Sequence, residues 1–341
     1  MYSFNNDYSE GAHPRILQAM MEANLEQNPG YGTDSHSAHA RELIRREIRR
    51  EDADVHFIPG GTQTNLLAVS GALRPHQAVI CAETGHINVH ETGAIEATGH
   101  KVLSCPTPDG ILTPEQLQRV LAHHTDEHMV QPKMVYISDA TEVGTIYTKA
   151  ALEELSRFCR LHGLYLFLDG ARLGSALASR ANDLTLADIA ELTDLFYIGG
   201  TKNGALFGEA LVLLHPDLKQ DFRFLIKQRG AMMAKGWLTG IQFEELFQNS
   251  LFLDMASHAN EMADLLRRAL SDRGIPLRWE SPANQIFPVL PDETAAALAE
   301  DFLFSVQEKP DQSHTCIRLV TSWATKPEGV EAFAAALRRL A

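Results

Sequence analysis

The stretch Leu164–Gly208 constrains the fold more than any other part of the chain. An apolar run ends in Asp169, and a second apolar run, Leu195–Ile198, enters a turn of small residues that holds Lys202. Short apolar runs closed by glycine are typical of buried strands, and open α/β sheets bind ligands at the carboxyl ends of such strands. We therefore expect the Asp169 carboxylate and the Lys202 amine on neighbouring strand ends in one crevice.

Two roles suit a lysine at such a strand end. It can contact a phosphate as a point charge, or, with its pKa lowered by partial burial, it can form a Schiff base with an aldehyde. Pyridoxal phosphate needs a Schiff-base lysine together with an anion beside its ring nitrogen. Lys202 and Asp169 supply both groups. The alternative is that Asp169 caps the next helix and Lys202 is a solvated loop residue.

The composition is that of an ordinary globular protein. The chain has 341 residues, 45% of them hydrophobic and 22% charged, which suits a large α/β domain with a smaller appendage. The formal charge of -14 argues against a nucleic-acid partner or an acidic membrane. The four cysteines lack a CxxC spacing, which disfavours a disulfide framework or a zinc site. Without a signal sequence or a long apolar run, we expect a cytoplasmic protein.

Strand and helix patterns alternate through residues 34–245. We expect strands at 55–58, 77–81, 134–138, 164–169, 195–198 and 209–214, and helices at 35–50, 66–73, 113–122 and 149–162. This alternation predicts a large domain with a mainly parallel sheet covered on both faces. Residues 1–33 are expected to form an N-terminal arm around a helix at 15–26. A helix at 238–272 leads into residues 246–341, where strands at 277–280, 285–290 and 315–320 predict a small α+β domain.

A glycine-rich turn follows the expected strand at 55–58 and precedes a helix. Gly61 and Thr62 lie where the backbone N–H groups and the dipole of that helix favour an anion. The turn matches neither the mononucleotide nor the dinucleotide fingerprint. We therefore expect a phosphate cradle, and the alternative is plain capping of the helix.

Other polar residues follow the remaining strands. His86 comes after the strand at 77–81, where its flat ring suits stacking on an aromatic ligand. Its spacing from His90 also suits a metal ion, but without an HExxH motif or a third ligand no metal is expected. Glu142 follows the strand at 134–138. Arg318 lies inside an apolar strand, which suggests a buried anionic partner.

Taken together, the motifs resemble one family of enzymes. In chain order they are Gly60-Gly-Thr-Gln63, Thr84-Gly-His86, Leu168-Asp-Gly-Ala-Arg172, Gly199-Gly-Thr-Lys-Asn-Gly204 and Ile317-Arg-Leu-Val-Thr-Ser-Trp323. The series resembles the threonine aldolases of the aromatic-amino-acid β-eliminating lyase group, which are fold-type-I pyridoxal-phosphate enzymes. The resemblance runs over nearly the whole chain and looks closest to the L-threonine and phenylserine aldolases.

The resemblance assigns roles to these residues in binding pyridoxal phosphate. Lys202 would form the Schiff base, Asp169 would pair with the pyridine nitrogen, His86 would stack on the ring, and Gly61 with Thr62 would hold the phosphate. These roles agree with the chemistry inferred from the residues themselves.

It also implies contacts with an amino-acid substrate and with a neighbouring subunit. Arg172 and Arg318 match arginines at the site, and Arg318 is the better candidate to grip the substrate carboxylate. Tyr31 and Lys235 match residues that a neighbouring subunit contributes, with Lys235 toward the phosphate. We therefore expect a homo-oligomer, a dimer or a homotetramer.

Two positions depart from the family pattern. Many members have a serine near the N-terminus that touches the substrate carboxylate, and Asn6 stands here instead. Many members have a histidine that contacts the β-hydroxyl, and the corresponding turn here holds Glu142. A carboxylate can act as the base directly or through water, or only anchor a water. The alternative is that Glu142 caps the following helix or stays solvated.

The predicted reaction is the retro-aldol cleavage of a β-hydroxy-α-amino acid, such as threonine, allo-threonine or phenylserine, to glycine and an aldehyde. A first alternative is another reaction of the same cofactor, β-elimination or transamination. A second is an α/β protein that binds a phosphorylated ligand without a covalent bond, with Lys202 as a simple phosphate contact.

Overall fold

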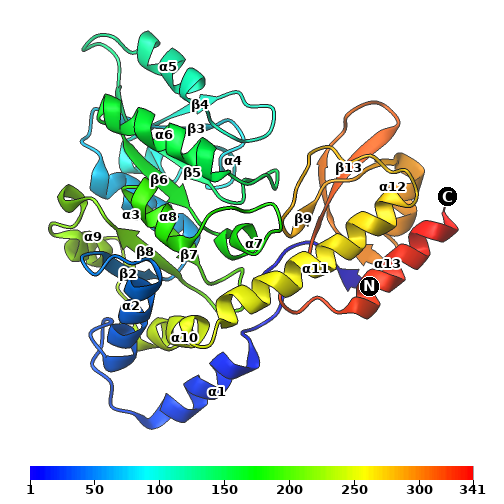
Figure 1. Ribbon diagram of the computed structural model, residues 1–341, viewed down its shortest axis with the longest axis horizontal. Coiled ribbons are helices and arrows are strands. Elements are labelled where there is room, and N and C mark those ends of the chain that lie inside the picture. Colours follow the sequence, from blue (N-terminus) through cyan, green and yellow to red (C-terminus); the bar gives the residue numbers. More distant parts are fainter. Residues whose placement is uncertain (341) are drawn as a thin grey trace.

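A seven-stranded sheet forms the centre of the larger lobe (Figure 1). The computed structural model describes residues 1–340 of the chain. The strands are β2 (Asp54–Ile58), β3 (Gln77–Ala82), β4 (Lys101–Cys105), β5 (Gln131–Ser138), β6 (Tyr165–Asp169), β7 (Leu195–Gly199) and β8 (Glu209–Leu213), in the order β2-β8-β7-β6-β5-β3-β4. Strands β3 to β7 are parallel, whereas β8 runs antiparallel to both of its neighbours. The expected α/β class with a mainly parallel sheet is confirmed.

Alternate side chains of these strands enter two different hydrophobic cores. Leu166 and Leu168 of β6 pack on one face of the sheet, and Phe167 packs on the other. The first face is covered by α2 (Ser35–Glu47), α5 (Pro114–His123), α6 (Lys149–His162), α8 (Leu186–Leu192) and α10 (Trp237–Phe247). The second is covered by α3 (Gly61–Ala72), α4 (His86–Val89) and α9 (Phe222–Gln228). Asp169 alternates in phase with Phe167, so it faces the side of α3.

A smaller lobe contains the second sheet and the C-terminal helices. Its strands are β9 (Gln285–Ile286), β10 (Val289–Pro291), β12 (Ser305–Glu308) and β13 (His314–Val320), and its helices are α11 (Leu251–Ser271), α12 (Asp292–Leu298) and α13 (Pro327–Arg339). Leu266, Ile317 and Phe333 belong to its core. The sheet is antiparallel.

The N-terminal arm lies against this smaller lobe. Strand β1 (Tyr2–Ser3) pairs in parallel with β11 (Phe302–Leu303), and Phe4 is fully buried in the same core. The chain then crosses to the larger lobe, where α1 (Pro14–Glu22) projects from the body of the molecule (Figure 1). Helix α7 (Leu173–Leu177) follows β6. The domain limits at residues 33/34 and 245/246 stay a prediction.

Four local expectations differ from the structure. The helix expected at 238–272 is interrupted between α10 and α11, because Asn249 and Ser250 have left-handed φ angles of 52° and 62°. The expected strand at 277–280 is reduced to a single bridge between Leu277 and Pro288, and the expected strand at 285–290 is divided into β9 and β10. Strand β4 was not expected, because its pattern of exposed and buried residues is irregular for an edge strand.

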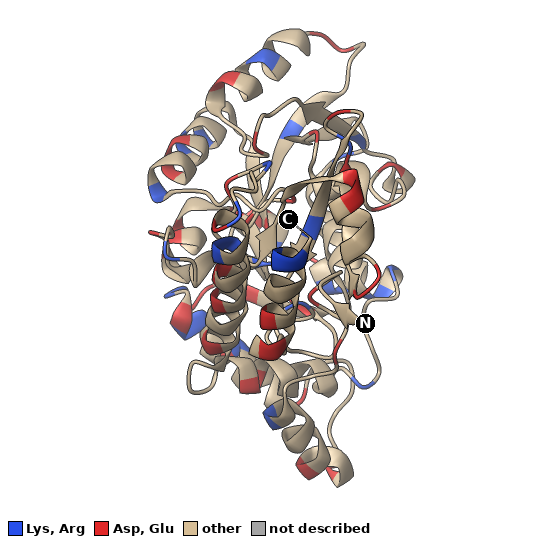
Figure 2. Cartoon of the chain, turned by 90° about the vertical axis from the view of Figure 1, so that its right-hand side faces the viewer, with Lys and Arg blue, Asp and Glu red and all other residues tan. Residues whose placement is uncertain are grey.

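In the two long helices of the smaller lobe the acidic residues precede the basic ones, as in α13, where Glu328 and Glu331 come before Arg338 and Arg339 (Figure 2). No helix within residues 1–340 is both long enough and apolar enough to cross a membrane.

Candidate active site

The carboxyl ends of the parallel strands surround a cavity of about 320 Å³. Strand β8 runs the opposite way, so its first residue, Glu209, reaches the same edge of the sheet. The N-terminal arm contributes Tyr8. The lining includes Tyr8, Gly60, Gly61, Thr62, Asn65, His86, Ser138, Glu142, Asp169, Arg172, Tyr197, Thr201, Lys202 and Glu209. The structure therefore brings Gly61, Thr62, His86, Glu142, Asp169, Arg172 and Lys202 together, as the sequence predicted.

Lys202 lies in the turn that follows β7. Burial lowers the pKa of its amine, and the nearby Arg172 charge lowers it further, against the opposing effect of three carboxylates, Asp7, Asp169 and Glu209. A lysine with a lowered pKa has a larger neutral fraction, and the neutral amine is the form that attacks an aldehyde. The environment therefore suits a Schiff-base lysine better than a point charge for phosphate.

Asp169 ends β6 and is held by donors from three other elements. Its Oδ2 accepts from the Tyr136 hydroxyl at 2.5 Å and from Asn65 Nδ2 at 3.0 Å. Its Oδ1 accepts from the backbone N–H of Ala171 at 3.0 Å and from the Tyr197 hydroxyl. The Ala171 contact lies in the turn before α7, whose N-cap is Arg172, so Asp169 does not cap this helix as the alternative supposed, and its other contacts come from outside the turn. Both oxygens of Asp169 therefore act as hydrogen-bond acceptors.

The turn after β2 forms an open N-terminus for α3. The N-cap residue is Gly60, and no side chain caps this helix end. Because the first N–H groups of a helix lack partners inside it, they remain available to an anion at the cavity wall. Gly61 also needs to be small, since a Cβ there would lie 3.3 Å from the Tyr197 hydroxyl. These features fit a phosphate group and outweigh plain capping.

His86 and Glu142 meet at the first turn of α4. Glu142 Oε1 accepts from the His86 backbone N–H at 3.0 Å and from the Ser138 hydroxyl at 2.8 Å. Glu142 therefore caps α4, not the helix that follows it in sequence. Burial raises the pKa of Glu142, and the charge of Asp169 raises it further. The ring of His86 is bound through Nδ1 to Glu91 Oε1 at 2.8 Å.

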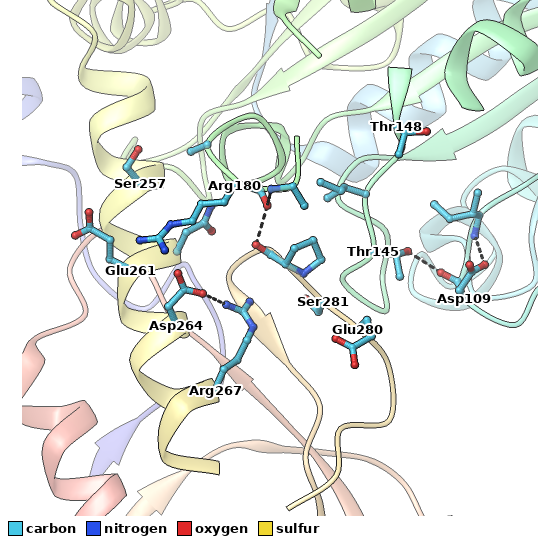
Figure 3. Close-up of a pocket in the computed structure, with 17 residues that line it drawn as sticks. Asp109, Thr145, Thr148, Arg180, Ser257, Glu261, Asp264, Arg267, Glu280 and Ser281 are labelled. Carbon is cyan, nitrogen blue, oxygen red and sulfur yellow. Dashed lines mark hydrogen bonds and ion pairs between the residues drawn. The ribbon is translucent and has the colours of Figure 1, made fainter. Parts of the chain in front are cut away.

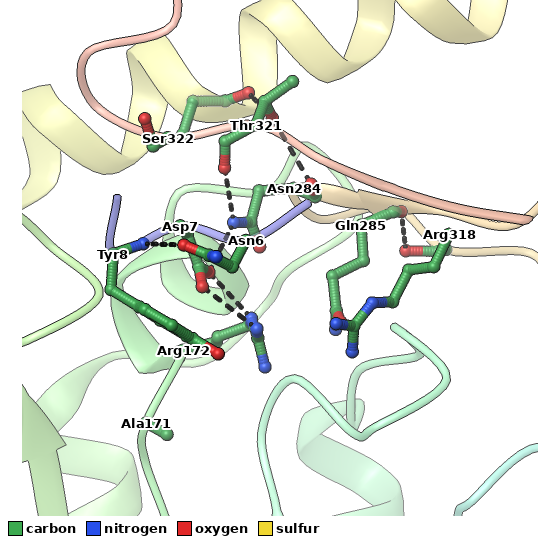
Figure 4. A network of polar contacts seen from close by, with 12 residues as sticks. Asn6, Asp7, Tyr8, Ala171, Arg172, Asn284, Gln285, Arg318, Thr321 and Ser322 are labelled. Carbon is green, nitrogen blue, oxygen red and sulfur yellow. Dashed lines mark hydrogen bonds and ion pairs between the residues drawn. The ribbon is translucent and has the colours of Figure 1, made fainter. Parts of the chain in front are cut away.

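Arg172 is engaged by the N-terminal arm (Figure 4). Its Nε and one terminal nitrogen donate to the two oxygens of Asp7 at 2.8 and 3.0 Å, and Asn284 donates to the same carboxylate at 2.9 Å. Burial opposes the charge of Asp7, but Arg172 and Lys202 lower the pKa of its carboxyl below the ordinary value. Arg172 lines the cavity, but two nitrogens of its guanidinium group already donate to the carboxylate of Asp7.

Arg318 projects from β13 and has no carboxylate partner within residues 1–340. Its terminal nitrogen contacts only the Ser305 hydroxyl at 3.4 Å, and its Nε is buried without a partner in the described chain. Burial lowers the pKa of its guanidinium, as does the nearby Arg172. The sequence suggested a buried anionic partner for Arg318, and the protein itself does not supply one in the part described.

Four residues expected at the site do not line the cavity, namely Arg318, Asn6, Tyr31 and Lys235. The Asn6 side chain turns back to its own loop, where its Oδ1 accepts from the Tyr8 N–H and the Ser9 hydroxyl, both at 3.0 Å. Tyr31 is 46% exposed and lies under the ammonium group of Lys227. Lys235 is exposed. The proposed contribution of Tyr31 and Lys235 to a neighbouring subunit stays a prediction.

Several polar residues of the site were missed by sequence reasoning. They are Asp7, Asn65, Glu91, Tyr136, Tyr197 and Glu209. The only signal for Glu209 was its place at the start of an apolar strand. Burial raises the pKa of Glu209 to about 8, although Thr201 and Gly200 donate hydrogen bonds to it.

A larger cavity, of about 790 Å³, lies elsewhere, between α11 and the segments 178–181 and 280–282 (Figure 3). Asp264 and Arg267, both on α11, form an ion pair of 2.6 Å in its wall. No lysine is among the described residues that line it, so it cannot hold an aldehyde cofactor covalently. Within residues 1–340 no group of three or more metal-ligating side chains is present.

Comparisons with known proteins show the family of the chain. The model of the beta-eliminating lyase family matches residues 6–293. A low specificity L-threonine aldolase of Pseudomonas aeruginosa is 34% identical over 86% of this chain and 86% of its own length. A low specificity L-threonine aldolase of a Pseudomonas species is 32% identical over 98% of this chain and 96% of its own.

Solved structures point the same way. The structure of a Leishmania major threonine aldolase has a TM-score of 0.99 and 56% identity over 100% of this chain and 99% of its own. A Thermus thermophilus aspartate aminotransferase, with a TM-score of 0.74 and 17% identity over 100% of this chain and 92% of its own, shares the fold alone. The chain belongs to the beta-eliminating lyase family, with the fold of the fold-type-I pyridoxal-phosphate enzymes, and is similar to the threonine aldolases.

Proposed function

We propose that this protein cleaves a β-hydroxy-α-amino acid, such as threonine, allo-threonine or phenylserine, to glycine and an aldehyde with pyridoxal phosphate as cofactor. The observation that carries the proposal is the pairing, in one cavity, of a lysine of lowered pKa with a fully hydrogen-bonded aspartate. When bound, pyridoxal phosphate supplies an electron-accepting ring for the electron pair left on Cα.

The residues that would hold this cofactor fit its chemistry. Lys202 supplies the amine, Asp169 the anion for the ring nitrogen, and the uncapped start of α3 at Gly61 and Thr62 the donors for its phosphate. His86 lines the same cavity and presents a flat ring. Four donors already surround the Asp169 carboxylate. The N–H of a protonated ring nitrogen would therefore displace one of these donors or share its acceptor oxygen.

Arg318 is the proposed ligand of the substrate carboxylate. Arg172 already makes a two-pronged contact with Asp7, whereas Arg318 lacks a carboxylate partner among the described residues. A buried guanidinium without an anion is unfavourable, so a carboxylate that pairs with it in two parallel hydrogen bonds is stabilised. Arg172 then acts mainly by fixing the N-terminal arm at the site.

Glu142 is the proposed base for the β-hydroxyl. Both of its hydrogen bonds fall on Oε1, and Oε2 has no partner within residues 1–340. Its raised pKa makes the carboxylate a stronger proton acceptor at neutral pH. As it takes the hydroxyl proton, the Cα–Cβ bond breaks and the Cβ–O bond becomes the carbonyl of the aldehyde. Cα then takes up a proton to give glycine.

The site is proposed to be completed by a second copy of the chain in a dimer or tetramer. Tyr31 and Lys235 lie outside the cavity of their own subunit and are available to a neighbour, with Lys235 directed to the phosphate. Asn6 is proposed to donate its amide N–H to the substrate carboxylate. Its side chain is held toward its own loop by the hydrogen bonds to Oδ1, so it has to rotate to reach the substrate. A cytoplasmic location remains part of the proposal.

The first experiment tests covalent attachment. Protein saturated with pyridoxal phosphate is expected to show a visible absorption band that borohydride removes, with the label on Lys202. Lys202→Ala is expected to lack the band, and Lys227→Ala, a lysine outside the cavity, to keep it. A colourless wild-type protein would instead favour the non-covalent binder of a phosphorylated ligand.

The second experiment separates the reactions of this cofactor by their products. Threonine is expected to give glycine and acetaldehyde. Pyruvate and ammonia from serine, without cleavage of threonine, would favour the β-eliminating alternative. Amino-group transfer to a keto acid would favour an aminotransferase.

The third experiment tests Glu142. Glu142→Gln keeps an oxygen that can accept from the His86 N–H and the Ser138 hydroxyl but cannot take a proton, so kcat/KM for threonine is expected to fall by about 100-fold or more. In the wild type, kcat/KM should rise as the pH passes upward through the raised pKa of this carboxyl, and the variant should lose that limb. An unchanged pH profile in Glu142→Gln would place the base elsewhere.

A further inference from the structure

In the wall of the cavity, one amide group joins two buried carboxylates. Asn65 Nδ2 donates to Glu91 Oε1 at 2.7 Å and to Asp169 Oδ2 at 3.0 Å. Glu91 Oε1 also accepts from His86 Nδ1 at 2.8 Å. The side chain of Glu91 is completely buried, and Asn65 is 1% exposed. The four residues therefore form a continuous chain of contacts from the imidazole ring to the acid at the end of β6.

This chain of contacts dictates which ring nitrogen of His86 faces the cavity. An ionised carboxylate only accepts hydrogen bonds, so the hydrogen must lie on Nδ1 of His86. Nε2 is then the nitrogen left for the cavity, which His86 lines. The partner of one ring nitrogen fixes both the tautomer and the orientation of an imidazole.

The same network is costly as a purely structural device. Glu91 Oε2 and Asn65 Oδ1 are buried without a partner in residues 1–340. A buried polar atom without a hydrogen bond destabilises the folded state, and a buried carboxylate more so. An apolar side chain at either position would avoid that cost, so retention of both polar groups indicates a role at the site.

We propose that Glu91 and Asn65 are positioning residues, with Glu91 fixing the tautomer and plane of the His86 ring and Asn65 tying that ring to the Asp169 carboxylate. The inference rests on the proposed function, in which His86 stacks on the cofactor ring and Asp169 pairs with the ring nitrogen. Neither positioning residue needs to touch the cofactor.

The charges around His86 agree with this role. Burial lowers the pKa of the imidazole, but the hydrogen bond to Glu91 and the charge of Asp169 raise it above the ordinary value, against Lys202. His90, 5.5 Å away between ring centroids, adds a further titratable neighbour. Glu142 reaches only the backbone of His86. Glu91 is therefore the group in direct contact with the titrating ring.

The test of Glu91 uses cofactor-free protein, so it does not depend on the proposed reaction. Nitrogen-15 NMR of labelled histidine gives the tautomer and the pKa of His86. The His86 signal is identified as the one that is missing from the spectrum of His86→Phe. Glu91→Gln is expected to lower the pKa of His86 by one unit or more, a tenfold change in protonation ratio, and to weaken the preference for hydrogen on Nδ1. Glu83→Gln, three residues before His86 and exposed, is the matched control and should leave both unchanged.

Outcomes separate this inference from the proposed function. If Glu91→Gln titrates as wild type does, with the same tautomer, the positioning role is wrong even if threonine is cleaved. Glu91→Asp, whose shorter side chain withdraws the oxygen but keeps the charge, should retain part of the raised pKa and serves if the glutamine variant fails to fold. For Asn65→Ala, the dissociation constant for pyridoxal phosphate is expected to rise at least tenfold, and an unchanged constant would overturn the tie to Asp169.

Discussion

The pairing of Asp7 with Arg172 makes the N-terminal arm essential to stability as well as to the site. Asp7 is 1% exposed and the Arg172 side chain 11%, and two hydrogen bonds of 2.8 and 3.0 Å join them. In Asp7→Asn the guanidinium remains buried without its counter-charge. Breaking a buried ion pair on one side costs about 3–5 kcal/mol, so we expect the free energy of unfolding to fall by about 3 kcal/mol or more.

The chain contains a matched control for this change. Arg50 and Asp52 form the same two-pronged contact at 2.7 and 2.8 Å, but their side chains are 36% and 59% exposed. Exposed ion pairs contribute about 0–1 kcal/mol, so Asp52→Asn should be nearly neutral. Each aspartate has one further donor, Asn284 for Asp7 and Lys219 for Asp52, so the difference between the two variants mainly measures the effect of burial.

Urea unfolding of the cofactor-free protein, followed by circular dichroism, measures both variants. The pKa of Asp7 is lowered in the folded protein, so its contribution is present above the ordinary carboxyl pKa of about 4 and is lost as the pH falls through the folded value. The gap between wild type and Asp7→Asn should therefore narrow in acid. A loss below about 1 kcal/mol at neutral pH, equal to that of Asp52→Asn, would refute the reasoning.

Three further predictions concern other parts of the molecule. Glu209 has a pKa of about 8 in the folded protein, whereas a glutamate in the unfolded chain releases its proton near 4.3, so the free energy of unfolding of the wild type should decline between those pH values. In urea titrations at several pH values, the free energy of unfolding of Glu209→Gln should decline less, and parallel pH curves for the two proteins would contradict this. Arg318→Lys removes the planar fork, so KM for threonine should rise about tenfold or more in steady-state assays, and an unchanged KM would assign the carboxylate to another group. Gly144→Ala should lower the melting temperature, because its φ is +83° and a Cβ would overlap the Ser281 side chain. Gly274→Ala is the control, since its φ is +64° but the space around it is open, so it should lower the melting temperature less. Equal losses in the two variants would show that the clash with Ser281 has no effect.

The sequence predicted the parts of the site that follow from strand ends. Apolar runs closed by polar residues located Asp169 and Lys202 correctly, because the carboxyl ends of parallel strands meet at one edge. The reversed direction of β8 could not be read from its uniformly apolar run, so Glu209 was not recognised as part of that edge. The break after α10 had a local signal in Asn249, since asparagine tolerates the left-handed conformation.

The second layer of polar groups was beyond sequence reasoning for a different reason. Asp7 contacts Arg172 across 165 positions of the chain, and Asn65 reaches Asp169 across 104. Such contacts depend on the relative placement of elements, which local patterns do not encode. An asparagine within a helical run and a glutamate at the end of a short helix look like ordinary surface residues until α3 and α4 are packed on the sheet.

The arm's strand pairing also sets an order of events during synthesis on the ribosome. Tyr2 and Ser3 are synthesised long before their partners, Phe302 and Leu303. Asp7 likewise waits for Asn284 before its contacts are complete. The arm can therefore make these contacts only after residues 284–303 have been synthesised, and the cavity, to which the arm contributes Tyr8, is completed later than the strands of the large sheet are made.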